Sequence, residues 1–229
     1  MLDMSAGEFT ALVRKAALGA GLEHGLAIEF ADAAAALAAA QPDTIGDAVV
    51  AALLEQGVAK APTRTGDGQW TLAPGPIVRL APTAIDLALA EPHGGAVRLP
   101  IGTPLAWLAA YVGSRPLAAP VRLEFVVSAE SEGAGTETAE HGLGAAETGA
   151  ATGQVLDPEG CLRGAAGRSR GAVSVRASRG EAWRCARADR VSLGDAALGD
   201  LLRWATETTV PTSEYSRARG AGADLDDNL

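Results

Sequence analysis

The chain has 229 residues and a formal net charge of −9, with 48% hydrophobic but only 4% aromatic residues. This charge argues against nucleic acid as the main partner, because phosphate binding needs a basic face. No apolar run is long enough to span a bilayer, and the first residues lack the basic and apolar stretches of a signal peptide, which predicts a cytoplasmic protein without a membrane partner.

The first predicted element is a helix. Ser5 and Glu8 have the spacing of a capping box, in which the serine accepts from a backbone amide and the glutamate reaches back. From Phe9 onward, apolar residues recur at helical spacing. The glycines within 19–21 are typical of a helix end, so this helix is expected to stop there.

Two further helices follow. The second is predicted from about residue 22 to residue 40, because Pro42 prevents its continuation. Thr44 can cap the third helix, which is expected to end near Gly57. Small residues dominate the apolar faces of these helices, and this predicts close packing between them.

The middle of the chain mixes extended and helical signals. Residues 70–80 read as extended, and Pro82 suits the first turn of a short helix that runs to residue 90. Residues 96–100 are predicted as a strand. The stretch 102–113 fits a buried helix or a buried strand, and its alanines favour the helix. Residues 119–127 alternate apolar and polar side chains, which indicates a strand.

A low-complexity segment, about residues 128–153, divides the second half of the chain. It has almost no large apolar residue, so burial cannot offset the entropy lost on ordering, and it reads as a long mobile loop or insertion. A chain of 229 residues can form one large domain or two small ones, and we expect a single domain, residues 1–229, that carries this loop.

Arginines gather between residues 163 and 190. Residues 172–177 are predicted as a strand that pairs with residues 181–186. One interpretation is a sheet edge whose arginines face solvent and discourage aggregation. The other is an anion-binding face. We favour the sheet edge, because the spacing of the arginines is irregular and no glycine-rich phosphate loop accompanies them.

A last helix is predicted to begin at a cap formed by Ser192 or Asp195 and to run to about residue 208, before Pro211. The pattern of the whole chain therefore indicates an α+β fold. Three N-terminal helices are followed by a mixed or antiparallel sheet and a C-terminal helix.

The segment 210–229 holds the candidate site of the sequence. Ser213, Ser216 and Arg217 could bind one anion, because two hydroxyls and a guanidinium suit a carboxylate. A small anionic metabolite is therefore the predicted ligand. The competing interpretation of these residues is a segment that docks on another surface.

Three further residues complete this candidate site. Gly220 and Gly222 let backbone amides approach a ligand. Glu214 could act as a general base if burial raised its pKa. The acidic residues beyond them suit a solvated tail better than a metal site. No cofactor is indicated, because phosphate-loop and dinucleotide motifs are lacking in the sequence.

The cysteines and histidines do not predict a metal or catalytic site. Cys161 and Cys185 are far apart in the sequence and are expected to be free, buried or half-buried thiols. His24, His93 and His141 each lack a second ligand at fixed spacing. Surface or capping positions are therefore predicted for the three histidines.

The two ends of the chain resemble a proteobacterial domain family of unknown function. Residues 15–21 read K-A-A-L-G-A-G and are followed by G-L-A at 25–27, which is similar to the opening of that family. Residues 210–217, V-P-T-S-E-Y-S-R, and the G-A-G-A at 220–223 resemble its closing signature. The chain differs at His24, where the family has Trp. The resemblance implies one domain across the chain and no particular reaction.

Two functions are compatible with these patterns. The first is a small-molecule metabolic protein, an enzyme or an accessory subunit of one, that binds an acidic metabolite near residues 213–222. The second is a non-catalytic interaction module whose C-terminus docks on a partner protein or a second copy of itself. Whether the protein is an enzyme stays open in both cases.

Overall fold

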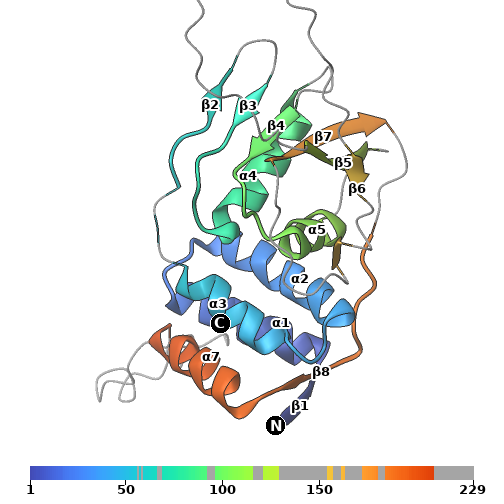
Figure 1. Ribbon diagram of the computed structural model, residues 1–229. Coiled ribbons are helices and arrows are strands. Elements are labelled where there is room, and N and C mark those ends of the chain that lie inside the picture. Colours follow the sequence, from blue (N-terminus) through green and yellow to red (C-terminus); the bar gives the residue numbers. More distant parts are fainter. Residues whose placement is uncertain are drawn as a thin grey trace, which may run out of the picture.

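The computed structural model describes residues 1–55, 57, 59–65, 69–91, 96–115, 121–128, 154–156, 161–162, 172–179 and 184–208 (Figure 1). The predicted loop from residue 129 to 153 and the segment 210–229 lie outside these ranges. Within them the chain has the predicted α+β fold. No helix of the described residues is long and apolar enough to cross a membrane.

Six helices are described, and they are α1 (Ala6–Gly19), α2 (His24–Ala40), α3 (Ile45–Leu54), α4 (Ile77–Ala90), α5 (Leu105–Ser114) and α7 (Asp195–Glu207). The large sheet lies at one end of the molecule in Figure 1, with α4, α5 and α2 beneath it and α1, α3 and α7 at the other end. The helices α1 and α7, which lie far apart in the sequence, pack side by side.

The strands form two sheets. They are β1 (Leu2–Ser5), β2 (Thr63–Arg64), β3 (Trp70–Thr71), β4 (Ala96–Leu99), β5 (Val121–Ser128), β6 (Gln154–Leu156), β7 (Ala172–Arg179) and β8 (Arg190–Leu193). The large sheet is mixed and has the order β2-β3-β4-β7-β5-β6, in which only β3 and β4 are parallel. The small sheet pairs β1 with β8.

The capping box at the start of α1 is confirmed. The Ser5 hydroxyl accepts a hydrogen bond from the Glu8 amide at 3.2 Å, and the Ser5 amide donates to the Glu8 carboxylate at 2.8 Å. Hydrogen bonds from Ser5 also hold the pKa of the Glu8 carboxyl below its usual range. Two donors at the helix N-terminus, which have no partner within the helix, are satisfied in this way.

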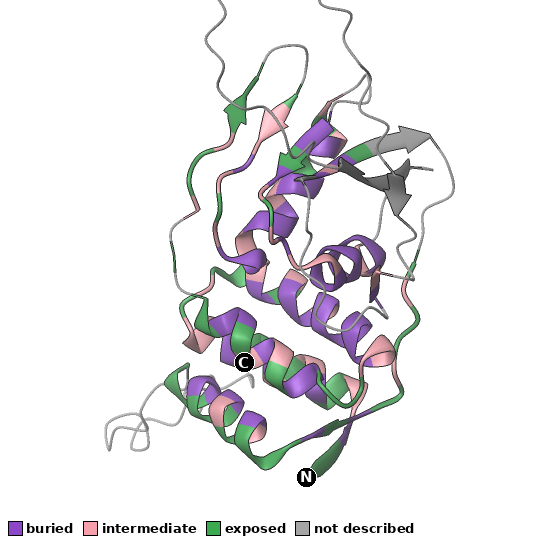
Figure 2. Cartoon of the chain, viewed as in Figure 1, coloured by how far each residue is buried: buried purple, intermediate pink, exposed green. Residues whose placement is uncertain are grey.

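Helix α2 lies in the middle of the helical part and is buried along most of its length (Figure 2). It packs against α1, α3, α4 and α5. Its buried residues are mainly alanines, and they let these neighbours approach closely. The one large aromatic contact is with α5, where the Phe30 and Trp107 rings stack with centroids 5.0 Å apart.

Close packing extends to α7, as the small residues predicted. A Cβ atom at Gly19 of α1 would overlap the backbone carbonyl of Trp204 on α7. A Cβ atom at Gly46 of α3 would lie 2.9 Å from the Cβ of Ala197 on the same helix α7. Two helices can therefore lie against α7 only because glycine stands at both contact points.

Helix α5 confirms the helical interpretation of residues 102–113, but the predicted start of α4 is wrong. Residues 77–80 are helical rather than extended, and Pro82 lies inside the helix. The apolar spacing continues through Pro82, whose ring is buried, so burial outweighs the hydrogen bond that proline cannot donate. The hydroxyl of Thr83 donates to the Arg79 carbonyl at 2.8 Å within the same turn.

The predicted pairing of residues 172–177 with residues 181–186 is also wrong. Strand β7 lies inside the sheet, with β4 on one side and β5 on the other. Both sides of β7 are therefore occupied, and it is not a sheet edge. Arg176 is nevertheless exposed on the sheet face. β7 pairs with the distant strand β5 instead of forming the predicted local hairpin with residues 181–186.

Neither of the two predicted caps, Ser192 or Asp195, is the N-cap of the last helix. Gly194 is the N-cap of α7, and its position has no side chain to cap the helix. Ser192 belongs instead to β8, where its hydroxyl donates to the Asp3 carboxylate of β1 at 3.4 Å. Pairing of β1 with β8 therefore places Ser192, one of the two predicted caps, in a strand.

We predict that Gly19→Ala lowers the free energy of unfolding by roughly 2–3 kcal/mol, because the added methyl group overlaps the α7 backbone. Chemical denaturation of the full chain measures this change. Gly199→Ala on α7 is the matched control, because a Cβ at Gly199 meets no atom within 4 Å. Its expected effect is a stabilisation of up to about 1 kcal/mol. Equal effects of the two substitutions would contradict the close contact.

A second prediction concerns the capping box. Ser5→Ala is expected to cost about 1 kcal/mol in the free energy of unfolding, because the Glu8 amide loses its acceptor. Thr44→Ala is the comparison, since Thr44 is the N-cap of α3 but makes no side-chain capping bond. It should cost clearly less in the same denaturation experiment.

Candidate functional site

The residues that the sequence proposed as a site lie outside the described part of the chain. The structure therefore brings none of them together, and their roles stay predictions. They are Ser213, Glu214, Ser216, Arg217, Gly220 and Gly222. The candidate site that can be built from described residues lies elsewhere, among the helices.

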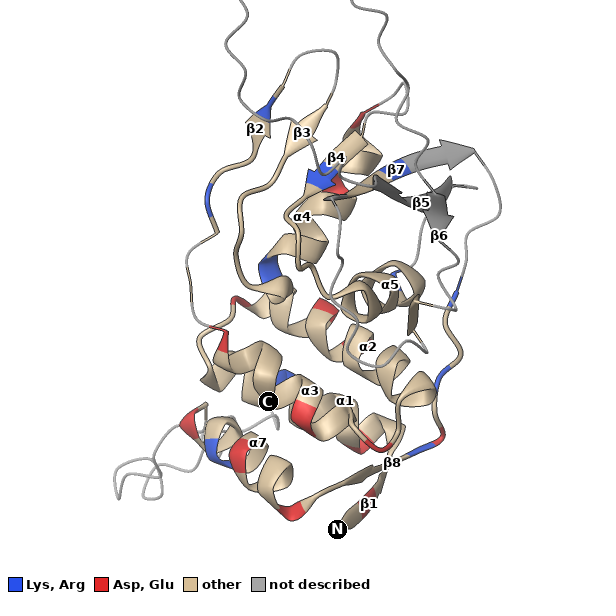
Figure 3. Ribbon diagram, in the orientation of Figure 1, with Lys and Arg blue, Asp and Glu red and all other residues tan. Residues whose placement is uncertain are grey.

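This candidate site is a cavity of about 280 Å³ between α2, α4 and α5. Its lining residues are Ile28, Glu29, Asp32, Ile85, Tyr111, Ser114 and Arg115. Tyr111 and Arg115 are four residues apart at the end of α5, and this spacing places them on the same side of the helix. Charged residues are sparse along α2, α4 and α5 (Figure 3), so the acids and the arginine here stand out.

The Tyr111 hydroxyl is the first unusual group of the cavity. The residue is only 2% exposed, and its hydroxyl has no hydrogen-bond partner among the described residues. Burial and, to a smaller extent, the charge of Glu29 raise the pKa of this phenol well above its usual value, so it stays protonated and can donate. Leaving such a group unpaired costs about 1–3 kcal/mol.

Arg115 is the second unusual group. Its Nη2 atom lies 2.6 Å from the Asp86 carboxylate of α4 and 3.8 Å from the Glu29 carboxylate of α2. Its Nη1 atom is buried and, within the described part of the chain, has no partner. Asp86 thus fixes one side of the guanidinium, while the other side keeps an unused donor.

The α2 side of the cavity is acidic. Glu29 and Asp32 are three residues apart on α2 and therefore lie on neighbouring positions of one face. Asp32 lies 4.0 Å from Arg187, and both side chains are exposed enough for water to screen the pair. The cavity accordingly combines donors from α5 with carboxylates from α2.

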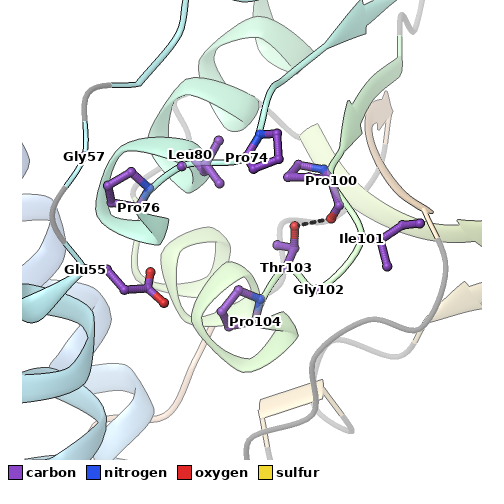
Figure 4. A pocket seen from close by; sticks show the side chains of 11 residues that line it. Glu55, Gly57, Pro74, Pro76, Leu80, Pro100, Ile101, Gly102, Thr103 and Pro104 are labelled. Atoms are coloured by element: carbon purple, nitrogen blue, oxygen red, sulfur yellow. Dashed lines mark hydrogen bonds between the residues drawn. The ribbon is translucent and has the colours of Figure 1, made fainter.

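A larger hollow, of about 390 Å³, lies near the start of α4 and α5 (Figure 4). Its lining is rich in proline, which offers no backbone donor, and includes Pro74, Pro76, Pro100 and Pro104. The buried Thr103 hydroxyl is satisfied here, because it donates to the Pro100 carbonyl at 2.6 Å. We place the candidate site in the smaller cavity, since the buried side-chain atoms without partners in the described ranges belong to two residues that line it, Tyr111 and Arg115.

Both cysteines are half-buried, as predicted, and they are not joined by a disulfide. Burial raises the pKa of the Cys185 thiol to about 12, so it is protonated at neutral pH and is a poor nucleophile. His24 is exposed at the first residue of α2, while His93 and His141 lie outside the described residues. In the described part, no three Asp, Glu, His or Cys side chains lie together as metal ligands would.

Sequence reasoning missed the cavity because it treated Tyr111 only as one apolar member of the stretch 102–113. One signal was present. A tyrosine in an otherwise apolar helix, with an arginine four residues later, places two polar groups on a buried face. The acids that complete the site come from α2 and α4, and no local pattern links them to α5.

Comparisons with known proteins do not assign the chain to a family. No family model, no curated protein and no solved structure matches the chain. The resemblance of its two terminal motifs to a proteobacterial family therefore stays a prediction.

We predict that Tyr111→Phe leaves the free energy of unfolding unchanged or raises it by about 1 kcal/mol, because it removes a buried hydroxyl that has no described partner. Denaturant unfolding without added ligand measures this effect. A loss of about 1 kcal/mol or more would mean that the hydroxyl is bonded in the free protein. Ser114→Ala is the control, because its hydroxyl donates to the Tyr111 carbonyl at 3.2 Å and its removal should destabilise.

Proposed function

We propose that this protein is a cytoplasmic bacterial protein of small-molecule metabolism, an enzyme or an accessory subunit of one, that binds an acidic metabolite between α2, α4 and α5. The observation that carries the proposal is the pair of buried donors without described partners, the Tyr111 hydroxyl and the Arg115 Nη1 atom. Native proteins pair nearly all such groups, so a ligand that accepts both hydrogen bonds is the simplest explanation.

The chemistry of the two donors favours a carboxylate. A neutral tyrosine and a guanidinium both donate, and the two oxygens of one carboxylate can accept from both. The apolar side chains of Ile28 and Ile85 would contact the carbon chain of the ligand. Since one water occupies ~30 Å³ of liquid, the cavity has the volume of about nine waters, which suits a short acid.

The sequence-predicted site at residues 213–222 is a second possible location for an acidic ligand. It would use Ser213, Ser216 and Arg217 as donors and Glu214 as a base. The two locations predict different sensitivities to substitution, so one experiment separates them.

A thermal-shift screen of the full chain against small carboxylates tests the proposal. A ligand at a hundredfold excess over its Kd should stabilise the folded protein by about 2.7 kcal/mol. Binding in the cavity is weakened in Tyr111→Phe and unchanged in Arg217→Ala. The opposite pattern would move the site to the C-terminal segment, and no shift with any carboxylate would contradict both locations.

A non-catalytic interaction module is the second candidate function. Leu54 at the end of α3 and Leu202 of α7 are 57% and 48% exposed, and these two helices pack together. Their exposed leucines are suited to contact with a second copy of the chain. A change of oligomeric state on removal of residues 212–229 or in Leu202→Ser, measured by size-exclusion chromatography with light scattering, would favour this function. Identical profiles would argue against it.

A further inference from the structure

The charges around the cavity define the ligand more narrowly than its two donors do. Three carboxylates contact or line this region, those of Glu29, Asp32 and Asp86, against the guanidinium groups of Arg115 and Arg187. The net charge of these five groups is −1 before any ligand binds. A ligand with a carboxylate as its single charged group would make this net charge −2 in a partly buried site, which is electrostatically unfavourable.

Glu29 shares its cation, Arg115, with a carboxylate that lies closer to it. Asp86 has a contact of 2.6 Å with Arg115, whereas the Glu29 carboxylate lies 3.8 Å from the same Nη2 atom. Asp32 faces the separate guanidinium of Arg187. Glu29 therefore lines the cavity together with Tyr111, and its longer, shared contact with Arg115 leaves it able to bind a further cation.

We propose that the ligand of this cavity carries a primary amine as well as a carboxylate, and thus belongs to the class of small amino acids. Tyr111 and Arg115 hold the carboxylate, and Glu29 holds the ammonium group with Asp32 nearby. Such a zwitterion adds no net charge to the site. This inference rests on the proposed function and narrows it to one substrate class.

Glu29 and Arg115 come from different helices, which gives the site its selectivity. A ligand must bridge from α5 to α2 to satisfy both groups, so an acid without the amine leaves Glu29 with its shared contact of 3.8 Å to Arg115. An amine without the carboxylate leaves the Tyr111 hydroxyl and the Arg115 Nη1 atom as they are in the free protein. Acids that differ only in the amine therefore test the Glu29 half of the site, and Tyr111→Phe tests the carboxylate half.

The experiment is calorimetric titration of the full chain with matched pairs of compounds: norvaline and valerate, and 4-aminobutyrate and butyrate. The amine-bearing member of at least one pair should bind about tenfold or more tightly than its partner, since one charge pair in a partly buried site supplies this factor. Glu29→Gln should remove this preference and keep the carboxylate affinity. Tyr111→Phe should weaken both members.

Glu23→Gln, at the N-cap of the same helix, is the matched control. Glu23 precedes α2, has an exposed side chain and forms its ion pair with Arg79 at 3.0 Å, away from the cavity. The Glu23→Gln variant should bind all four compounds with the affinities of the wild type. Equal binding of amine-bearing and amine-free acids, or an unchanged preference in Glu29→Gln, overturns the inference but leaves the proposed function intact. If none of the four compounds nor any carboxylate binds, the proposed function fails and this inference with it.

Discussion

The close approach of helices to α2 is the constraint on which the rest of the described structure depends. Alanines over most of its length let α1, α3, α4 and α5 surround it without large side chains between them. Small residues also allow close packing where α7 contacts Gly19 and Gly46. A chain with 4% aromatic residues thus reaches dense packing through short distances rather than through bulky groups.

The candidate site lies where this packing of small residues is interrupted. Beside the alanines of α2 stand Ile28, Glu29 and Asp32, which are too long or too polar to allow the same contact. Asp86 and Glu29 reach Arg115 across the gap, and Asp86 holds one side of its guanidinium. Rigid helices therefore position the donors, which is the arrangement that precise recognition of a small ligand requires.

Local signals in the sequence predicted local structure well. The capping box of Ser5 and Glu8 and the helix at residues 105–114 needed only neighbouring residues. The pairing of β7 and the start of α4 depended on distant partners and on burial around Pro82, so the sequence misplaced both. The cavity was not predictable either, because three helices contribute its polar groups. All the residues that the sequence favoured as a site follow α7, outside the described ranges.

The pairing of β1 with β8 has a consequence for the order of folding. Leu2 is the register partner of Leu193, so nearly the whole described chain separates two strands that form one ladder. Such a high contact order slows folding, because the entropy of closing the loop is lost before the contact forms. During synthesis, the side of α1 around Gly19 has no α7 to cover it until residues 195–207 have left the ribosome. A nascent chain of this protein therefore leaves this side of α1 without its α7 contact until a late stage of synthesis.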